Sequence, residues 1–259
     1  MKYTPKAFMI TALTNMHVGA GGANYGVVDN LVQRDPVTDM PVIHASSLKG
    51  ALREFFDNYL NKGPDFIDHV FGPDLTRGAK DPGIGKYKFF QADLLALPVR
   101  SNNAPYYLAT APCLIDNINE KARSLGLDEK FIKGNYDFDA DIVTQHGNTI
   151  LEDYQAQRAP QWDIWEKFGN EPVAVYKNHK FKQRGKELPV IARNKLENGQ
   201  SVNLWYEEIV PRKSKFIFFV NIPDNDPYMA DFIKEMTSHT VQIGANATIG
   251  YGYVNIEKI

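Results

Sequence analysis

The alternation of apolar and polar residues predicts strands along much of the chain. Residues 6–16 have the pattern of a half-buried strand, and a second short strand is expected over residues 27–33, after a glycine-rich segment. Residues 88–100 and 106–110 are predicted to pair as a hairpin. Residues 215–222 are almost wholly apolar, which indicates a buried strand.

Helical spacing appears in three other segments. Residues 48–60 repeat apolar side chains on one face after two serines and are expected to stop at Gly63-Pro64, and residues 112–126 show the same periodicity. A third helix is predicted to begin with Asp226 as N-cap and Pro227 at its first position, because that residue pair favours a helix start. Residues 128–169 give no clear pattern, apart from a short helix expected around Trp162, Trp165 and Phe168.

The C-terminal third adds a hairpin and two closing strands. Asn198-Gly199 lies between strand-like residues 190–195 and 202–206, and Asn-Gly is a strong two-residue hairpin signal. Strands are also expected over residues 240–243 and 253–259, on either side of a second glycine-rich segment. This order of elements predicts an α+β fold on an antiparallel sheet. With no repeat or long linker, residues 1–259 are expected to form one domain with insertions.

Composition restricts the class of protein. The 259 residues contain 29 Lys and Arg against 31 Asp and Glu, and 43% are apolar, which is typical of a soluble globular chain. No apolar run approaches the ~20 residues that a membrane helix needs, and no secretory signal is found, so no membrane partner is expected. The single cysteine, Cys113, fits a reducing compartment, which predicts a cytoplasmic location.

One segment departs from the acidic average. Residues 176–195 carry seven Lys or Arg residues and one glutamate, whereas the rest of the chain has 22 basic and 30 acidic residues. Such a split suggests a surface for a polyanion, although a charge run alone is more often a solvated loop. Tyr176, His179 and Phe181 lie among the cations, and aromatic side chains can stack on nucleic-acid bases.

A second anion-binding feature precedes the helix at residues 48–60. Ser46-Ser47 can act as a helix cap, which is the simpler interpretation. Lys49 in the first turn, however, is disfavoured by the helix dipole by ~0.3–1 kcal/mol, and Gly50 costs about 1 kcal/mol relative to alanine. Both choices are useful if a phosphate docks there, because the lysine neutralises it and the glycine allows close approach.

Several common catalytic and metal-binding motifs are absent from the sequence. It has no Walker loop, HExxH, GxSxG or CxxC motif. Asp137, Asp139 and Asp141 imitate the start of a calcium loop, but Ile142 stands where the sharp turn needs glycine, so a solvated strand face is favoured.

Five motifs in order resemble one known family. They are His-Val-Gly-Ala-Gly at residues 17–21 with Gly-Val-Val-Asp-Asn-Leu-Val-Gln-Arg-Asp at 26–35, Ser-Ser-Leu-Lys-Gly at 46–50, Leu-Pro-Val-Arg-Ser at 97–101, Leu-Trp-Tyr-Glu-Glu at 204–208, and the glycine loop at 242–252. Together they resemble the RAMP proteins of type III CRISPR effectors, and most closely the backbone ribonuclease subunit of Cmr-type (III-B) complexes.

The resemblance implies a ferredoxin-like (RRM-like) core with an antiparallel sheet, inserted regions and a β-hairpin thumb, here at approximately residues 176–208. It implies that copies of the chain stack head to tail on a CRISPR guide RNA with other Cmr-type subunits. Complementary target RNA would be cut at regular intervals, with Mg²⁺ or Mn²⁺. The expected reaction is attack of the 2′-OH on phosphorus, leaving a 2′,3′-cyclic phosphate.

The resemblance also assigns residues. Asp29 occupies the family's catalytic position, supported by His17 and Glu207. Because an ordinary aspartate is a weak base at neutral pH, we expect Asp29 to hold or orient the metal ion. The predicted RNA-binding residues combine the basic segment with the motifs: Ser46, Ser47, Lys49, Arg53, Lys177, Lys180, Lys182, Arg184, Arg193, Lys195, Gly244, Asn246 and Thr248.

Some positions depart from the family pattern. His44-Ala45 stands where Pro-Gly is usual, Ala247 replaces an acid, and Ile209 stands where some relatives carry a functional tyrosine. Two alternatives therefore stay open. One is a guide-RNA scaffold that does not cut, and the other is the equivalent ribonuclease of a type III-A complex.

Overall fold

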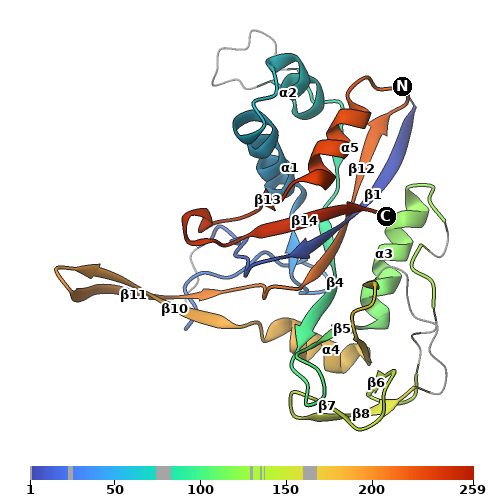
Figure 1. Ribbon diagram of the computed structural model, residues 1–259, viewed down its shortest axis with the longest axis vertical. Helices are drawn as coiled ribbons and strands as arrows, with labels where there is room; N and C mark the ends of the chain where they lie inside the picture. Colours follow the sequence, from blue (N-terminus) through green and yellow to red (C-terminus); the bar gives the residue numbers. More distant parts are fainter. Residues whose placement is uncertain are drawn as a thin grey trace.

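The computed structural model describes residues 2–22, 26–73, 83–128, 131–134, 136, 138–159 and 168–259. Within these residues, twelve strands form one mostly antiparallel sheet in the order β13-β14-β1-β12-β4-β5-β9-β6-β8-β7, with β2 on β4 and β3 on β12 (Figure 1). The strands are β1 (Tyr3–Ala12), β2 (Val42–Ile43), β3 (Lys88–Phe89), β4 (Ala92–Val99), β5 (Tyr107–Thr110), β6 (Ile142–Thr144), β7 (Thr149–Leu151), β8 (Tyr154–Arg158), β9 (Val173–Tyr176), β12 (Lys215–Pro223), β13 (Val241–Gln242) and β14 (Tyr253–Lys258).

Helices cover both faces of the sheet. They are α1 (Ala45–Glu54), which continues as a π-helix over Phe55–Tyr59, α2 (Pro64–Phe71), α3 (Pro112–Ser124), α4 (Asn178–Lys186) and α5 (Met229–Ser238), with a 3₁₀ turn at Ala247–Ile249. Helices α1, α2 and α5 lie on one side of the central strands and α3 on the other (Figure 1). Pro64 and Pro112 stand at helix starts, where the missing N–H of proline costs no hydrogen bond.

The central strands are buried because each face meets a helix layer. In β1, Phe8 and Ile10 pack in the cluster that contains α1 and α5, whereas Ala7 and Met9 pack with α3. Strand β12 alternates in the same way beside it, with Phe218 opposite Phe8 and their rings stacked 5.2 Å apart. The buried strand predicted at residues 215–222 is therefore confirmed.

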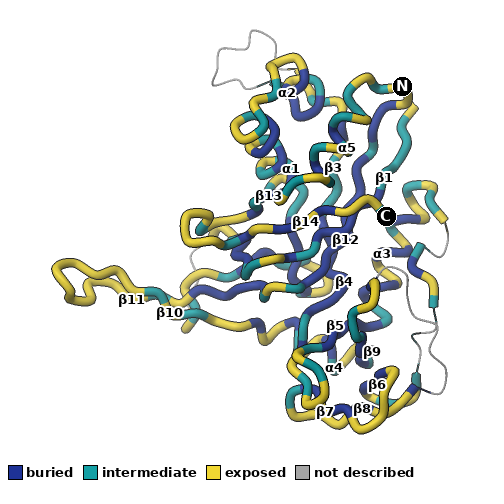
Figure 2. Tube along the Cα trace, viewed as in Figure 1, coloured by how far each residue is buried: buried dark blue, intermediate teal, exposed yellow. Residues whose placement is uncertain are grey.

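A second, two-stranded sheet projects from the body. This sheet consists of strands β10 (Val190–Glu197) and β11 (Gln200–Glu208), which extend away from the other elements (Figure 1). The predicted Asn198-Gly199 turn is confirmed, with φ angles of 50° and 80°. Most of the hairpin is exposed to solvent (Figure 2), while its foot, Glu207 and Glu208, is buried.

The α+β class with a ferredoxin-like core is confirmed, and so are the β4–β5 hairpin and the helix at residues 112–126. The strand predicted at residues 27–33 is wrong: this stretch forms only isolated bridges, because it crosses the hairpin's foot instead of joining the sheet. The expected cap at Ser46-Ser47 is also wrong, since α1 begins at Ala45 with His44 as N-cap and both serines lie inside the first turn.

Other boundaries differ from expectation. Pro64 opens α2 in addition to ending the previous helix. Helix α5 begins at Met229 with Tyr228 as N-cap, two residues later than expected, although Asp226 Oδ1 still accepts the Tyr228 N–H at 3.0 Å. The Asp226 carboxylate also bonds His69 and Tyr87. The basic residues 178–186 form α4, so they precede the hairpin on a helix. Asp137, Trp162 and Trp165 lie outside the described residues. Within the described residues, no helix is long and apolar enough to cross a membrane.

Candidate functional site

Asp29 lies beside the foot of the hairpin and is exposed to solvent. Its Oδ2 accepts the main-chain N–H of Tyr206 at 2.7 Å, while the N–H groups of Asp29 and Asn30 both donate to the Tyr206 carbonyl at 3.1 Å. Asn30 in turn accepts the Glu208 N–H at 2.9 Å. These bonds attach the residue 29–30 segment to the free edge of β11, so the position of Asp29 depends on the hairpin.

His17 contacts the same foot and is buried. Its Nδ1 is 2.7 Å from the Glu208 carbonyl oxygen. Since a carbonyl only accepts, Nδ1 carries the hydrogen, and in the neutral ring Nε2 is then the acceptor. A Cβ added at Gly19 would lie 3.1 Å from Nε2, so the glycine leaves room for the ring.

Both oxygens of the Glu207 carboxylate accept hydrogen bonds. Oε1 accepts the Trp205 indole N–H at 2.9 Å, and Oε2 accepts Asn246 Nδ2 at 2.9 Å and a short bond from Arg193 Nε. Burial raises the pKa of the Glu207 carboxyl, but the hydrogen bonds from Trp205 and Arg193 and the charge of Arg193 bring it below its ordinary value. Glu207 therefore stays ionised and holds its neighbours in place.

The glycine loop at residues 244–252 holds the main chain of His17. The Ala245 N–H donates to the His17 carbonyl at 2.8 Å. Gly244 has a φ of +95°, and a Cβ there would come within 2.5 Å of the same oxygen, so this position requires glycine. Asn246 reaches Glu207, whereas Gly244 and Thr248 are exposed.

Three site residues escaped the sequence analysis. Glu208 points away from Glu207 and forms a buried ion pair with Arg34, and its Oε2 accepts the Val32 N–H at 3.0 Å. Gln33 donates to Ser47 Oγ at 2.8 Å and to the Gly19 carbonyl at 3.2 Å, which joins α1 to the His17 segment. Successive residues in a strand face opposite sides. The sequence therefore indicated that Glu208 would need a different cation from Glu207.

The predicted RNA-binding residues divide into solvent-facing and internally paired groups. Lys177, Lys180 and Lys182 lie on or beside α4, and Lys180 covers the Tyr154 ring. Arg53, Arg184, Arg193 and Lys195 are engaged with Gly72, Glu187, Glu207 and Glu197 respectively. Ser46 is exposed and Lys49 half-buried on the first turn of α1. Burial and the nearby Arg53 lower the pKa of Lys49.

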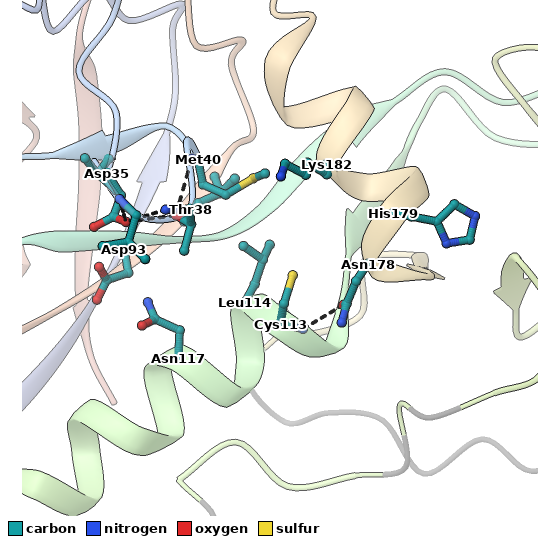
Figure 3. Close-up of a pocket in the computed structure, with 13 residues that line it drawn as sticks. Asp35, Thr38, Met40, Asp93, Cys113, Leu114, Asn117, Asn178, His179 and Lys182 are labelled. Carbon is teal, nitrogen blue, oxygen red and sulfur yellow. Dashed lines mark hydrogen bonds between the residues drawn. The ribbon is translucent and has the colours of Figure 1, made fainter.

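A separate pocket of about 270 Å³ lies between α3, α4 and the turn at residues 35–40 (Figure 3). Lys182 and His179 line it from α4, with the His179 ring turned away from the other residues, and Cys113 and Leu114 line it from α3. None of Asp29, His17 and Glu207 lines it. Its carboxylates are already engaged, Asp93 by Lys121 and Asp35 by Thr38, so the hairpin's foot is the better candidate for chemistry.

A comparison with models of known protein families identifies the family of the chain. The model of the RAMP superfamily matches residues 9–255, which is nearly the whole chain. The chain belongs to the RAMP superfamily. The Asp29 and His17 segments, the hairpin's foot and the glycine loop all lie inside the matched range.

Individual RAMP relatives agree with the predicted subgroup. The chain is 25% identical to the CRISPR system Cmr endoribonuclease Cmr4 of Pyrococcus furiosus, covering 97% of this chain and 95% of the relative. It is 26% identical to the CRISPR system CMR subunit Cmr4 of Saccharolobus solfataricus, with the same coverage. A chain of the type III-B Cmr-beta complex bound to cognate target RNA superposes with a TM-score of 0.79 at 23% identity, covering 98% of this chain and 97% of that one. The resemblance to the Cmr-type backbone subunit is confirmed.

Proposed function

We propose that this RAMP chain is the guide-RNA-binding backbone subunit of a type III-B CRISPR effector complex, and that it cleaves complementary target RNA at regular intervals. The observation that carries the proposal is the meeting of Asp29 and His17 on residues 206–208 at the foot of a projecting hairpin. The endoribonuclease name of the Pyrococcus relative supports the activity. Nearly full coverage of two Cmr4 relatives favours type III-B over type III-A.

The reaction is attack of a ribose 2′-oxygen on the adjacent phosphorus, with departure of the 5′-oxygen of the next nucleotide. His17 Nε2 accepts a proton from the reacting RNA, because Nδ1 is committed to the Glu208 carbonyl. Asp29 orients the reacting group from the exposed edge of β11, and the hairpin displaces a nucleotide so that the attacking and leaving oxygens can align. Glu207 acts indirectly, because its hydrogen bonds hold Trp205 and Asn246 in place.

A divalent cation fits this site only with help from the RNA. The described residues contain no group of three or more His, Cys, Asp or Glu side chains arranged to hold a metal. Asp29 Oδ1 has no partner among those residues, whereas both oxygens of Glu207 are occupied. Mg²⁺ is commonly held by one or two carboxylates together with substrate phosphates, so Asp29 with an RNA phosphate would hold Mg²⁺ or Mn²⁺. The ion would neutralise charge developing on the phosphate.

The rest of the surface serves the RNA and neighbouring subunits. Lys49 on the first turn of α1 and the cations of α4 provide positive charge for an RNA backbone. We propose that guide RNA follows these elements and that further copies of the chain stack head to tail along it, with other Cmr-type subunits. The binding should weaken as salt rises, because phosphate contacts release counterions.

Cleavage of end-labelled complementary RNA by the complex, reconstituted on a guide, tests the proposal. Evenly spaced products with 2′,3′-cyclic phosphate ends are expected, lost with EDTA and restored by Mn²⁺. A bound but intact target would support the non-cutting scaffold, for which Ala247 and Ile209 are the motivating residues. Ile209 is buried, its N–H donates to the Pro189 carbonyl, and its aliphatic side chain offers no hydroxyl in place of the tyrosine of some relatives. Irregular cutting, or no RNA binding, would contradict the proposal.

A further inference from the structure

Arg193 lies where the hairpin meets the body. It is opposite Trp205 in the β10–β11 register, and its side chain is only 15% exposed. Its Nε donates to Glu207, and the guanidinium carbon lies 4.6 Å from the centre of the Tyr251 ring. A single side chain therefore contacts both the hairpin's foot and the glycine loop.

The chemistry of this contact requires an arginine. A buried carboxylate is costly unless a cation and hydrogen bonds compensate it. Trp205 and Asn246 provide neutral hydrogen bonds to Glu207, so Arg193 is its charge partner. A planar guanidinium can donate to a carboxylate and lie over an aromatic ring at the same time, which a lysine ammonium does less well.

The two elements joined by Arg193 hold the candidate site together. The hairpin holds Asp29 through the Tyr206 N–H and the His17 ring through the Glu208 carbonyl. The glycine loop holds the main chain of His17 through the Ala245 N–H, and the Gly252 N–H donates to the Asn15 carbonyl at 2.9 Å. A rotation of the hairpin relative to the loop would therefore move Asp29 relative to the His17 main chain and disturb the bond that orients the His17 ring.

We propose that Arg193 is a positioning residue, which fixes the hairpin against the glycine loop through Glu207 and Tyr251 and so sets Asp29 and His17 for cleavage. This role replaces the direct RNA contact expected of Arg193. It rests on the proposed nuclease function, but the contact itself can be measured without RNA.

Trp205 reports on the contact directly, because its indole N–H binds the Glu207 carboxylate. In a full-length Trp162→Phe/Trp165→Phe background, Trp205 is the only tryptophan, and its fluorescence can follow Glu207 as pH is lowered. With Arg193 present, the transition should lie below the ordinary glutamate range, since Arg193 lowers the Glu207 pKa. Arg193→Met should move the midpoint upward by about one pH unit or more. Tyr251→Leu should move it less.

Lys195→Met is the matched control. Lys195 lies two residues further along β10 and pairs with the exposed Glu197, so its removal should leave the Trp205 transition unchanged. In the reconstituted complex, Arg193→Met should lower the cleavage rate at least tenfold with guide-RNA binding changed less than threefold. Arg193→Lys should recover the fluorescence midpoint more fully than the cleavage rate, because lysine restores the charge without the stacking.

The outcomes separate the two proposals. A fluorescence midpoint that does not respond to Arg193→Met, while circular dichroism shows a folded chain, overturns the contact. A shifted midpoint with wild-type cleavage by the Arg193→Met complex overturns the positioning role. If the wild-type complex itself cuts no RNA, the proposed function fails, and a shifted midpoint would still establish the contact between hairpin and loop.

Discussion

The Asp29 carboxylate accepts the main-chain N–H of Tyr206 at 2.7 Å, although 177 residues separate them in sequence. The bond uses one oxygen of Asp29, whose side chain is exposed at the foot of the hairpin, and the other oxygen has no partner among the described residues. The candidate site is thus completed by a strand that arrives late in the chain, and a hairpin displaced by RNA or by a neighbouring subunit would carry Asp29 with it.

The space next to His17 can be tested with glycines. Gly19→Ala places a Cβ about 3.1 Å from Nε2 and should turn the ring, lowering the cleavage rate by about 10- to 100-fold. Gly22→Ala is the control, because nothing lies within 4 Å of a Cβ there. Both rates are measured with the reconstituted complex. Equal rates for the two variants would mean that the Nε2 environment does not matter.

His17→Asn separates the two ring nitrogens. The asparagine Nδ2 can still donate to the Glu208 carbonyl, but no atom replaces Nε2. If Nε2 transfers a proton, single-turnover cleavage should fall by about 10²–10⁴-fold with RNA affinity unchanged. Retention of the wild-type rate would show that His17 only supports the main chain.

The ion pair between Arg34 and Glu208 should contribute strongly to stability. Arg34→Met leaves Glu208 buried without its cation and removes hydrogen bonds to the Asp39 and Gly185 carbonyls. The free energy of unfolding, from guanidinium denaturation, should fall by about 3–5 kcal/mol. Lys186→Met breaks an exposed pair with Asp39 and should cost at most about 1 kcal/mol. Similar losses in both variants would contradict the assigned burial.

The lowered pKa of Glu207 predicts that the stability of the chain depends on pH. Its pKa is lower in the folded chain than its ordinary value, so its contribution is present above the unfolded pKa and is lost as pH falls through the folded one. The stability advantage of the wild type over Glu207→Gln should therefore be largest near neutral pH and shrink below about pH 4.3. Denaturation midpoints at pH 7, 5 and 3 measure it. A constant difference across the series would contradict the ionised state.

Sequence patterns located the elements whose side chains repeat regularly. Strands β1 and β12, helix α3 and the Asn198-Gly199 hairpin follow local periodicity or turn chemistry. The alternation of residues 27–33 predicted a strand, but these residues form only single bridges to Glu207 and Gly19. Those partners are distant in sequence, so the local pattern could not indicate them.

The candidate site was located through motifs rather than spacing. Asp29, His17 and Glu207 were named from the family resemblance, and the structure brings all three to the hairpin's foot. The pairing of Arg193 with Glu207 depends on the β10–β11 register and on the loop that presents Tyr251. No local pattern encodes that arrangement, so Arg193 looked like one more cation in a basic segment.

Cleavage by complexes that carry Asp29→Asn or Asp29→Ala, beside the wild type, tests the central claim most directly. Asparagine keeps an oxygen for the Tyr206 N–H and removes only the charge, whereas alanine removes both. We predict that both variants bind guide and target RNA within about threefold of the wild type and that neither produces the evenly spaced fragments. Wild-type cutting by Asp29→Asn would contradict a charged role for Asp29, and equal loss of binding and cutting would contradict its assignment to catalysis.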